Sequence, residues 1–228
     1  NYFKMLQKYN YIVSNRNKIL KKIRNNSTPT SELAFWNKEL ISLSTFITKI
    51  RMDVLKKITQ NLNPIQKMLS NNTDNISLKY VPSYEQTEPI NEQSIETAIQ
   101  KAISNKENYE IKYGFSLFGP HRDQIKILLD GMDLKKYGSR GQFRTAILSI
   151  KFAEAEYLKN QIGIEPIILL DDVMSELDSK RRALLINMLD GYKQVLITTT
   201  EKKIFESLLE SNKINVFHIN AGIILKDD

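Results

Sequence analysis

Apolar side chains recur at three- and four-residue intervals through the first 60 residues, the spacing of a helix with one buried face. This spacing predicts a first helix over residues 2–24. Thr28 followed by Pro29 suits the start of a second helix, whose stripe continues for about seven turns until Pro64. Two long helices with a short connection predict an antiparallel hairpin.

The pattern changes after Pro64. Residues 65–91 are rich in Asn, Ser and Thr, and we interpret them as a linker with one edge strand near 76–80. Helical spacing returns over residues 91–105. We therefore expect a helical arm with its linker at residues 1–90 and a second domain at 91–228.

A two-residue period indicates strands after residue 105. Residues 109–118 and 124–129 are predicted to be extended, and Asp130-Gly131 is a strong hairpin-turn signal. Helical and apolar strand-like segments then alternate, which predicts a parallel α/β core. The expected helices lie near 142–160, 179–190 and after 198, and the expected strands near 166–170, 194–198 and 214–225.

Two acids end the first of these apolar strands. The four apolar residues 167–170 predict a buried parallel strand, and Asp171 and Asp172 follow at its carboxyl end, where open α/β sheets bind ligands. Such acids can hold Mg²⁺ and orient or deprotonate an attacking water. Taken alone, the pair is equally typical of a strand that ends in a polar turn or a helix N-cap.

Two neighbouring motifs give the acids a context. Ser139-Arg140-Gly141-Gln142 opens the long helix before them, and Ser175-Glu176-Leu177-Asp178 follows them. Together these strings resemble the signature, Walker B and D-loop motifs of the ABC-type ATPases of the SMC and RecF group, the RecF family most closely. The similarity extends to Gly119–Asp123 and to Trp36–Leu40 in the arm, so it covers nearly the whole chain. It implies an α/β ABC-type ATPase lobe, a parallel sheet with flanking helices, plus a helical-hairpin lid subdomain.

The resemblance also implies roles for individual residues. A serine hydroxyl and amides at a helix N-terminus favour phosphate, although an ordinary capped helix start has the same residues. In the family this loop closes over the γ-phosphate of ATP held by a second subunit. The resemblance therefore implies that Asp171 supports Mg²⁺, that Asp172 acts on the attacking water, and that the residues contacting the nucleotide in trans are Ser139, Arg140, Gly141, Gln142, Ser175 and Asp178.

The sequence departs from the general ABC pattern in three ways. No G-x-x-x-x-G-K-[ST] phosphate loop is present; Gly114 and Gly119 have its spacing, but Pro120 follows and removes an amide donor. The second acid is Asp172 rather than the longer Glu, which favours a slow ATPase. Thr199 or Thr200 stands where many ABC proteins have a γ-phosphate-contacting histidine, and threonine carries no charge.

Because the chain starts with Asn1 rather than methionine, we expect it to be part of a longer protein whose N-terminal segment contains the phosphate loop. ATP and Mg²⁺ are then cofactors of the full-length protein. The chain alone is expected to bind neither and to be inactive.

Basic residues are concentrated at the front of the chain. Residues 1–80 hold 14 Lys and Arg against 4 Asp and Glu, whereas the remainder holds 19 against 22. A basic face attracts phosphate backbones, so nucleic acid is the leading partner class; a solvated helical arm is the alternative. The residues that we expect to contact DNA are Lys18, Lys21, Lys22 and Arg24.

Other classes of site and location are disfavoured. The chain has no cysteine and no apolar run approaching the roughly 20 residues of a membrane span, so we expect a cytoplasmic protein without disulfides. His121 and His218 are far apart and lack cysteine partners, which argues against a metal site. His121-Arg122-Asp123 suggests an ion-pair corner or an interface without assigned chemistry.

The function implied by the resemblance is ATP-dependent, dimerising DNA binding in recombinational repair of single-strand gaps. The implied partners are double-stranded or gapped DNA, a second copy of the protein, RecR and RecO. One alternative is a non-enzymatic scaffold that binds only protein or DNA. Another is an SMC-like or transporter-type ABC subunit, but an arm of about 60 residues is short for an SMC coiled coil.

Overall fold

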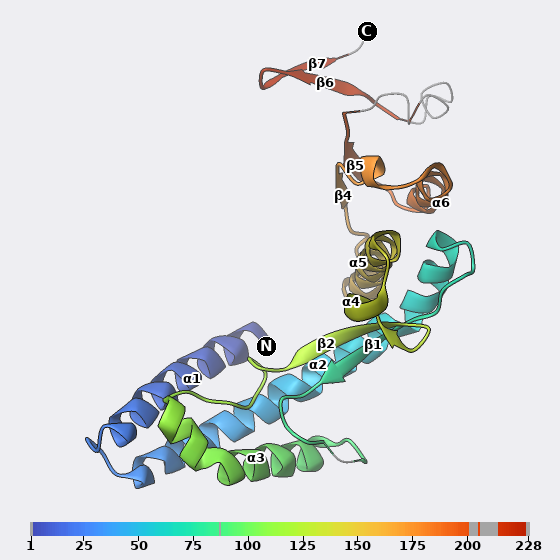
Figure 1. Cartoon of the computed structure of the whole chain (residues 1–228). Coiled ribbons are helices and arrows are strands. Elements are labelled where there is room, and N and C mark those ends of the chain that lie inside the picture. The colour runs from blue at the N-terminus through green and yellow to red at the C-terminus, as the bar shows by residue number, and fades with distance from the viewer. Residues whose placement is uncertain (1, 87, 201–204, 206–213, 227–228) are drawn as a thin grey trace. The chain divides into compact units, whose positions relative to one another are not determined.

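The structure is a computed structural model that describes residues 2–86, 88–200, 205 and 214–226. The chain divides into two compact units, Asn1–Tyr157 and Leu158–Asp228. Figure 1 shows their elements in chain order. Within the described ranges, no helix is both long enough and apolar enough to cross a membrane.

The predicted helical hairpin opens the first unit. Helix α1 (Tyr2–Arg24) and helix α2 (Leu33–Leu69) run antiparallel, joined through the 3-10 turn η1 (Thr30–Glu32) (Figure 1). The expected start at Thr28 was wrong, because Pro29 is the residue before η1 and no side chain caps this turn.

Helix α2 also continues past its expected end. Pro64 removes an amide donor from the helix, yet the helix extends to Leu69. Leu62 and Gln66, on either side of the proline, are fully buried. Their packing holds the backbone helical where the local signal predicts a break.

Helix α3 (Glu92–Tyr113) is longer than its apolar spacing suggested. It begins with a capping box, in which Asn91 Oδ1 accepts from the Ser94 amide and Ser94 Oγ accepts from the Asn91 amide, each at 2.9 Å. It ends at Gly114, whose φ of 73° suits glycine. The expectation of an extended chain from residue 109 was therefore wrong as far as Tyr113.

The three long helices share one core. Leu20, Ile23 and Leu33 form a smaller cluster at the turn of the hairpin. Helix α3 packs on the hairpin, because its buried residues belong to the same main cluster as those of α1 and α2. The expected boundary between lid and lobe at residues 90 and 91 stays a prediction for the complete protein. The buried members of the main cluster are Tyr9, Ile12, Leu40, Leu43, Ile47, Tyr84, Ile95, Ile99 and Ile103.

An antiparallel sheet forms a second core in the same unit. Strands β1 (Ile76–Val81), β2 (Gln124–Leu129) and β3 (Met132–Asp133) lie in that order, and Ile76 pairs with Leu129. The predicted hairpin turn is confirmed by positive φ angles of 49° at Asp130 and 81° at Gly131. Helices α4 (Leu134–Tyr137) and α5 (Arg140–Ile162) follow. The residues of this core are Leu62, Ile76, Leu129, Leu134, Ala146 and Ala153.

The second unit contains the predicted parallel pair of strands. Strand β4 (Ile168–Asp171) pairs with β5 (Val195–Thr198), and the turn η2 (Met174–Glu176) and helix α6 (Ser179–Leu189) connect them. The expected closing strands form the hairpin of β6 (Phe217–Asn220) and β7 (Ile223–Lys226). The expected helix after residue 198 lies largely outside the described residues.

Strand β4 is buried on one face only. Ile168 and Leu170 are buried, whereas the side chain between them, Leu169, is 71% exposed. The run of apolar residues predicted burial on both faces, as in a complete parallel sheet. Among the described residues of this unit, the side chains of β4 are therefore buried on one face and exposed on the other.

Candidate functional site

The acids at the end of β4 are held by the neighbouring strand. Asp171 pairs in register with Thr198 of β5, and the Thr198 hydroxyl donates to Asp171 Oδ1 at 2.5 Å. Both residues are exposed. The parallel pairing therefore fixes one carboxylate oxygen of Asp171 at the carboxyl edge of the sheet, where α/β folds bind ligands.

Asp172 begins the turn that leaves the strand. Its φ of 49° is uncommon outside glycine, and its amide donates to the carbonyl oxygen of Thr198 at 3.2 Å and to the hydroxyl at 3.1 Å. The Ser175 hydroxyl donates to the Asp172 carbonyl at 2.9 Å. The structure thus brings Asp171, Asp172 and Ser175 together around Thr198.

Asp178 has a local role in the structure. It is the N-cap of α6, and its side chain accepts from the Arg181 amide at 2.9 Å and from Arg181 Nη1 at 2.8 Å. The backbone hydrogen bond from Arg181 is the main reason that the pKa of Asp178 lies below its usual value. Buried Met174 and Leu177 hold the segment between Asp172 and this cap.

The expected signature residues form the start of α5 in the first unit. The Ser139 amide donates to Gln142 Oε1 at 3.0 Å, and the Gln142 amide donates to Ser139 Oγ at 3.2 Å. This reciprocal cap satisfies two of the four amides that a helix start leaves without a partner in the helix. It leaves Arg140 and Gly141, at the first helical positions, with amides directed out of the helix end.

Helix α5 is tied to the hairpin by a buried polar contact. The Ser149 hydroxyl donates to Gln66 Oε1 of α2 at 2.8 Å, and both residues are fully buried. Ala146 and Ala153 pack beside it in the second core. The direction of the helix that starts at Ser139 is therefore set by α2 and the antiparallel sheet.

The sequence placed Thr198 in the run Thr198–Thr200 after the strand but did not pair it with Asp171. The positions considered for a γ-phosphate contact were Thr199 and Thr200, which follow the strand; Thr199 is half-buried and Thr200 exposed. Thr198 is the residue that contacts Asp171, because it occupies the paired position in the register of β4 and β5. Aligning the carboxyl ends of the two predicted parallel strands would have placed Asp171 beside Thr198.

The string His121-Arg122-Asp123 forms a hydrogen-bonded corner in the first unit. The Tyr9 hydroxyl and His121 Nδ1 are hydrogen-bonded at 2.5 Å. Asp123 accepts from the Tyr80 hydroxyl at 2.5 Å and from the Ser83 amide at 2.7 Å. These contacts join α1, the end of β1 and the loop before β2, so the structural reading of this string is the one that the geometry supports.

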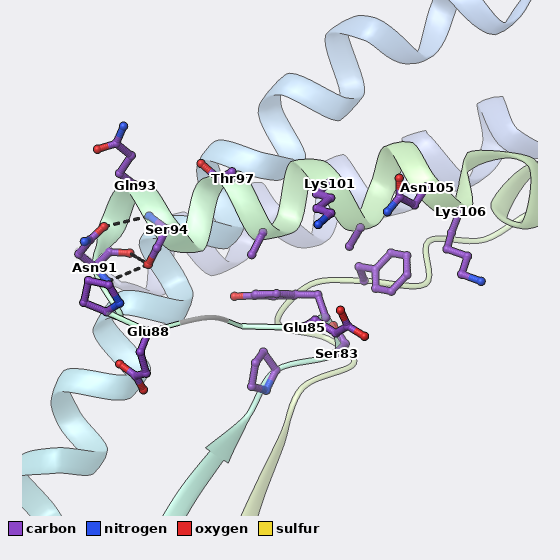
Figure 2. Close-up of a pocket in the computed structure, with 16 residues that line it drawn as sticks. Ser83, Glu85, Glu88, Asn91, Gln93, Ser94, Thr97, Lys101, Asn105 and Lys106 are labelled. Atoms are coloured by element: carbon purple, nitrogen blue, oxygen red, sulfur yellow. Dashed lines mark hydrogen bonds between the residues drawn. The ribbon is translucent and has the colours of Figure 1, made fainter.

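A separate open groove of about 750 Å³ lies between α3 and the segment that precedes it (Figure 2). Its lining carries both acidic and basic side chains, including Glu85, Glu88, Lys101 and Lys106. None of the expected nucleotide-contact residues lines it. In the part of the chain that the structure describes, no group of three or more His, Cys, Asp or Glu could hold a metal ion by itself.

The basic residues expected to contact DNA lie on one helix. Lys18, Lys21, Lys22 and Arg24 are all exposed in the last two turns of α1. They can therefore meet a phosphate backbone without rearrangement of the core.

No family model matches the chain. Curated relatives are nevertheless similar to it over nearly its whole length. The DNA replication and repair protein RecF of Halothermothrix orenii is 38% identical over 99% of the chain and 60% of the relative. That of Alkaliphilus oremlandii is 35% identical over 98% and 60%. The chain thus spans about 60% of the length of these relatives.

Solved structures agree with the sequence comparison. A structure of the recombination mediator protein RecF with ATPrS, in the RecFOR pathway, covers 99% of this chain and 58% of its own, with a TM-score of 0.84 and 32% identity. A second, RecF with ATP, has a TM-score of 0.83 and 31% identity. The expected fold class, an α/β ABC-type ATPase lobe with a helical-hairpin lid, is confirmed. Over its 228 residues, the chain is similar in sequence and in fold to about 60% of the length of these RecF proteins.

Proposed function

We propose that this chain is the part of a RecF-type protein that completes an ATP site between two copies and couples it to DNA binding in recombinational repair of single-strand gaps. The observation that carries the proposal is the pair Asp171 and Asp172, held by Thr198 at the carboxyl edge of a parallel sheet. The similarity to proteins described as DNA replication and repair protein RecF adds the context of replication and repair.

The acidic pair fits Mg²⁺. This ion takes oxygen ligands and is usually bound through one or two carboxylates plus substrate phosphates. In the complete protein Asp171 would hold the ion beside the phosphates of ATP, where it neutralises charge. Asp172 would orient the attacking water, and its short side chain favours slow hydrolysis. Thr199 or Thr200 would at most donate a hydrogen bond to the γ-phosphate.

The phosphate loop would come from a part of the protein outside these 228 residues. The start of α5 would then contact the γ-phosphate of ATP bound to a second copy. There Ser139 and Gln142 would exchange their mutual hydrogen bonds for the phosphate, joined by the outward amides of Arg140 and Gly141. Ser175 and Asp178 would line the same seam.

Closing two copies around ATP would bring two basic arms onto DNA. The exposed Lys18, Lys21, Lys22 and Arg24 would contact phosphates and would not read the sequence. Double-stranded or gapped DNA is the proposed substrate. Because solved RecF structures are described as belonging to the RecFOR pathway, we also propose RecR and RecO as partners.

The experiment is sedimentation of the complete protein, phosphate loop included, with and without ATP and Mg²⁺. The parent should dimerise only with ATP, and Ser139→Arg should abolish dimerisation, because a larger, charged side chain fills the γ-phosphate contact. Ser42→Arg, at an exposed serine of α2, is the matched control and should dimerise as the parent does. Behaviour independent of ATP in all three proteins would instead support a non-enzymatic scaffold.

A further inference from the structure

One threonine hydroxyl contacts both acids at the end of β4. The Thr198 hydroxyl donates to Asp171 Oδ1 at 2.5 Å and accepts from the Asp172 amide at 3.1 Å. A hydroxyl has a single proton, an amide N–H can only donate, and an ionised carboxylate can only accept. The proton of Thr198 must therefore point at Asp171, so chemistry fixes the direction of both hydrogen bonds.

The two hydrogen bonds strengthen one another. A hydroxyl that accepts a hydrogen bond becomes a better donor, and hydrogen bonds from a hydroxyl to an ionised carboxylate are short, about 2.5–2.7 Å. The distance between Thr198 Oγ1 and Asp171 Oδ1 lies in that range. Among the described residues, Oδ1 is the only carboxylate oxygen of Asp171 that accepts a hydrogen bond. The contact thus restrains rotation of the carboxylate and leaves Oδ2 open to a cation.

The backbone around Thr198 supports the acids separately. Asp171 pairs with Thr198 in the register of β4 and β5, and the Asp172 amide also donates to the carbonyl oxygen of Thr198 at 3.2 Å. The Ser175 hydroxyl holds the Asp172 carbonyl at 2.9 Å. These contacts do not use the side chain of Thr198. Removing its hydroxyl alone should therefore keep the strand pairing and the turn at Asp172, and release the carboxylate of Asp171.

We propose that Thr198 is a positioning residue, whose hydroxyl orients Asp171 toward Mg²⁺ and thereby sets the Mg²⁺ concentration at which ATP joins two copies of the protein. Polar partners behind a metal ligand fix its orientation, and losing one typically costs about 10- to 100-fold in metal affinity. Thr198 acts through Asp171 and needs no contact of its own with the ion. The inference rests on the proposed ATP site and adds the residue that tunes it.

The test is the Mg²⁺ dependence of ATP-driven dimerisation of the complete protein, phosphate loop included, measured by sedimentation at a fixed ATP concentration. Thr198→Val keeps the branched shape and removes the hydroxyl. It should raise the Mg²⁺ concentration at half-maximal dimerisation about 10-fold or more, and saturating Mg²⁺ should restore the dimer. Thr198→Ser, which keeps the hydroxyl, should recover most of this loss.

Two further variants isolate the contact. Thr59→Val removes a hydroxyl that donates to the Leu55 carbonyl within α2 at 2.7 Å; it is the matched control and should leave the Mg²⁺ dependence unchanged. Asp171→Asn weakens the Mg²⁺ ligand directly. If Thr198 acts through Asp171, adding Thr198→Val to Asp171→Asn should cause no further shift, whereas independent effects would add.

The role of Thr198 is overturned if Thr198→Val needs no more Mg²⁺ than the parent, or if Thr198→Ser is shifted as far as Thr198→Val. Full additivity with Asp171→Asn, or a parent that dimerises with ATP regardless of Mg²⁺, overturns it as well. A Thr198→Val protein that only unfolds more readily, with an unchanged Mg²⁺ midpoint, would make Thr198 a structural residue. A parent that does not dimerise with ATP, or an Asp171→Asn protein that behaves as the parent does, refutes the proposed ATP site itself.

Discussion

Replacing Glu110 by Gln removes one charge from an ion pair that has no contact with solvent. Arg16 and Glu110 both have side chains at 0% exposure, and their N–O distance is 2.5 Å. In Glu110→Gln the guanidinium keeps its charge but loses the carboxylate that compensates it. The amide group also places a donor where Glu110 now accepts from either Arg16 or Leu117.

The structure supports a large effect. Removing one partner of a buried pair costs about 3–5 kcal/mol, because the remaining charge stays desolvated. Domains are typically stable by only about 5–15 kcal/mol. With a urea dependence of about 2–3 kcal/mol per molar, the midpoint of unfolding should fall by about 1–2.5 M.

The assay is urea unfolding followed by tryptophan fluorescence. Trp36 is the only tryptophan of the chain and packs against the core of the three helices, so it reports on this part of the first unit. Asp53→Asn is the control: it breaks the pair of Lys49 and Asp53, whose side chains are 44% and 52% exposed, and should cost less than about 1 kcal/mol. Similar midpoints for the two variants would refute the reasoning. A double variant, Arg16→Met with Glu110→Leu, should lose less stability than the sum of the losses caused by Arg16→Met alone and Glu110→Leu alone, because no unpaired charge remains buried. A loss equal to that sum would also refute the reasoning.

Two further predictions concern the loop before β2. Gly119→Ala should destabilise the chain by about 2–3 kcal/mol, because at a φ of 116° the new Cβ would lie 2.5 Å from the Tyr9 hydroxyl. Gly131→Ala is the control: it has open space around it and should cost only about 1 kcal/mol. Equal losses of stability in urea unfolding would show that the clash with Tyr9 is not the cause. Burial is the main reason that the pKa of His121 lies below its usual value of 6.5. The unfolded chain therefore binds a proton at this histidine more tightly than the folded chain does. The contribution of neutral His121 to the free energy of unfolding should be complete above about pH 6.5 and decline as the pH falls below that value. Measured as urea midpoints across this range, the decline should be shallower in His121→Gln; identical pH profiles would show that another group is responsible.

Local sequence signals predicted the structure correctly where the residues of a single turn or strand determine its conformation. The Asp130-Gly131 hairpin turn and the parallel strands ending at Asp171 and Thr198 were all read from short patterns, because turn chemistry and strand periodicity act over a few residues. They failed where distant packing decides. Helix α2 passes Pro64 because Leu62 and Gln66 are buried by other elements, which no window around the proline shows.

The candidate site divides in the same way. The motifs identified Asp171, Asp172 and Ser139 by their order along the chain. Thr198, 27 residues after Asp171, emerged only from the register of two strands. Arg16 is charged and resembled the other basic residues of the arm, yet its partner Glu110 lies 94 residues away and makes it a core residue. Pairing over such separations is a property of the tertiary fold.

The length of α2 gives the first unit mechanical leverage. Its 37 residues make a rod of about 55 Å. Near its carboxyl end, Gln66 is bonded to Ser149 of the helix that starts at Ser139; at its amino end, Leu33 packs on Leu20 and Ile23 beside the basic end of α1. A tilt of about 5° would move the far end by about 5 Å over that length. A small displacement at the start of α5 would therefore be amplified into a shift comparable to the spacing between phosphates on DNA.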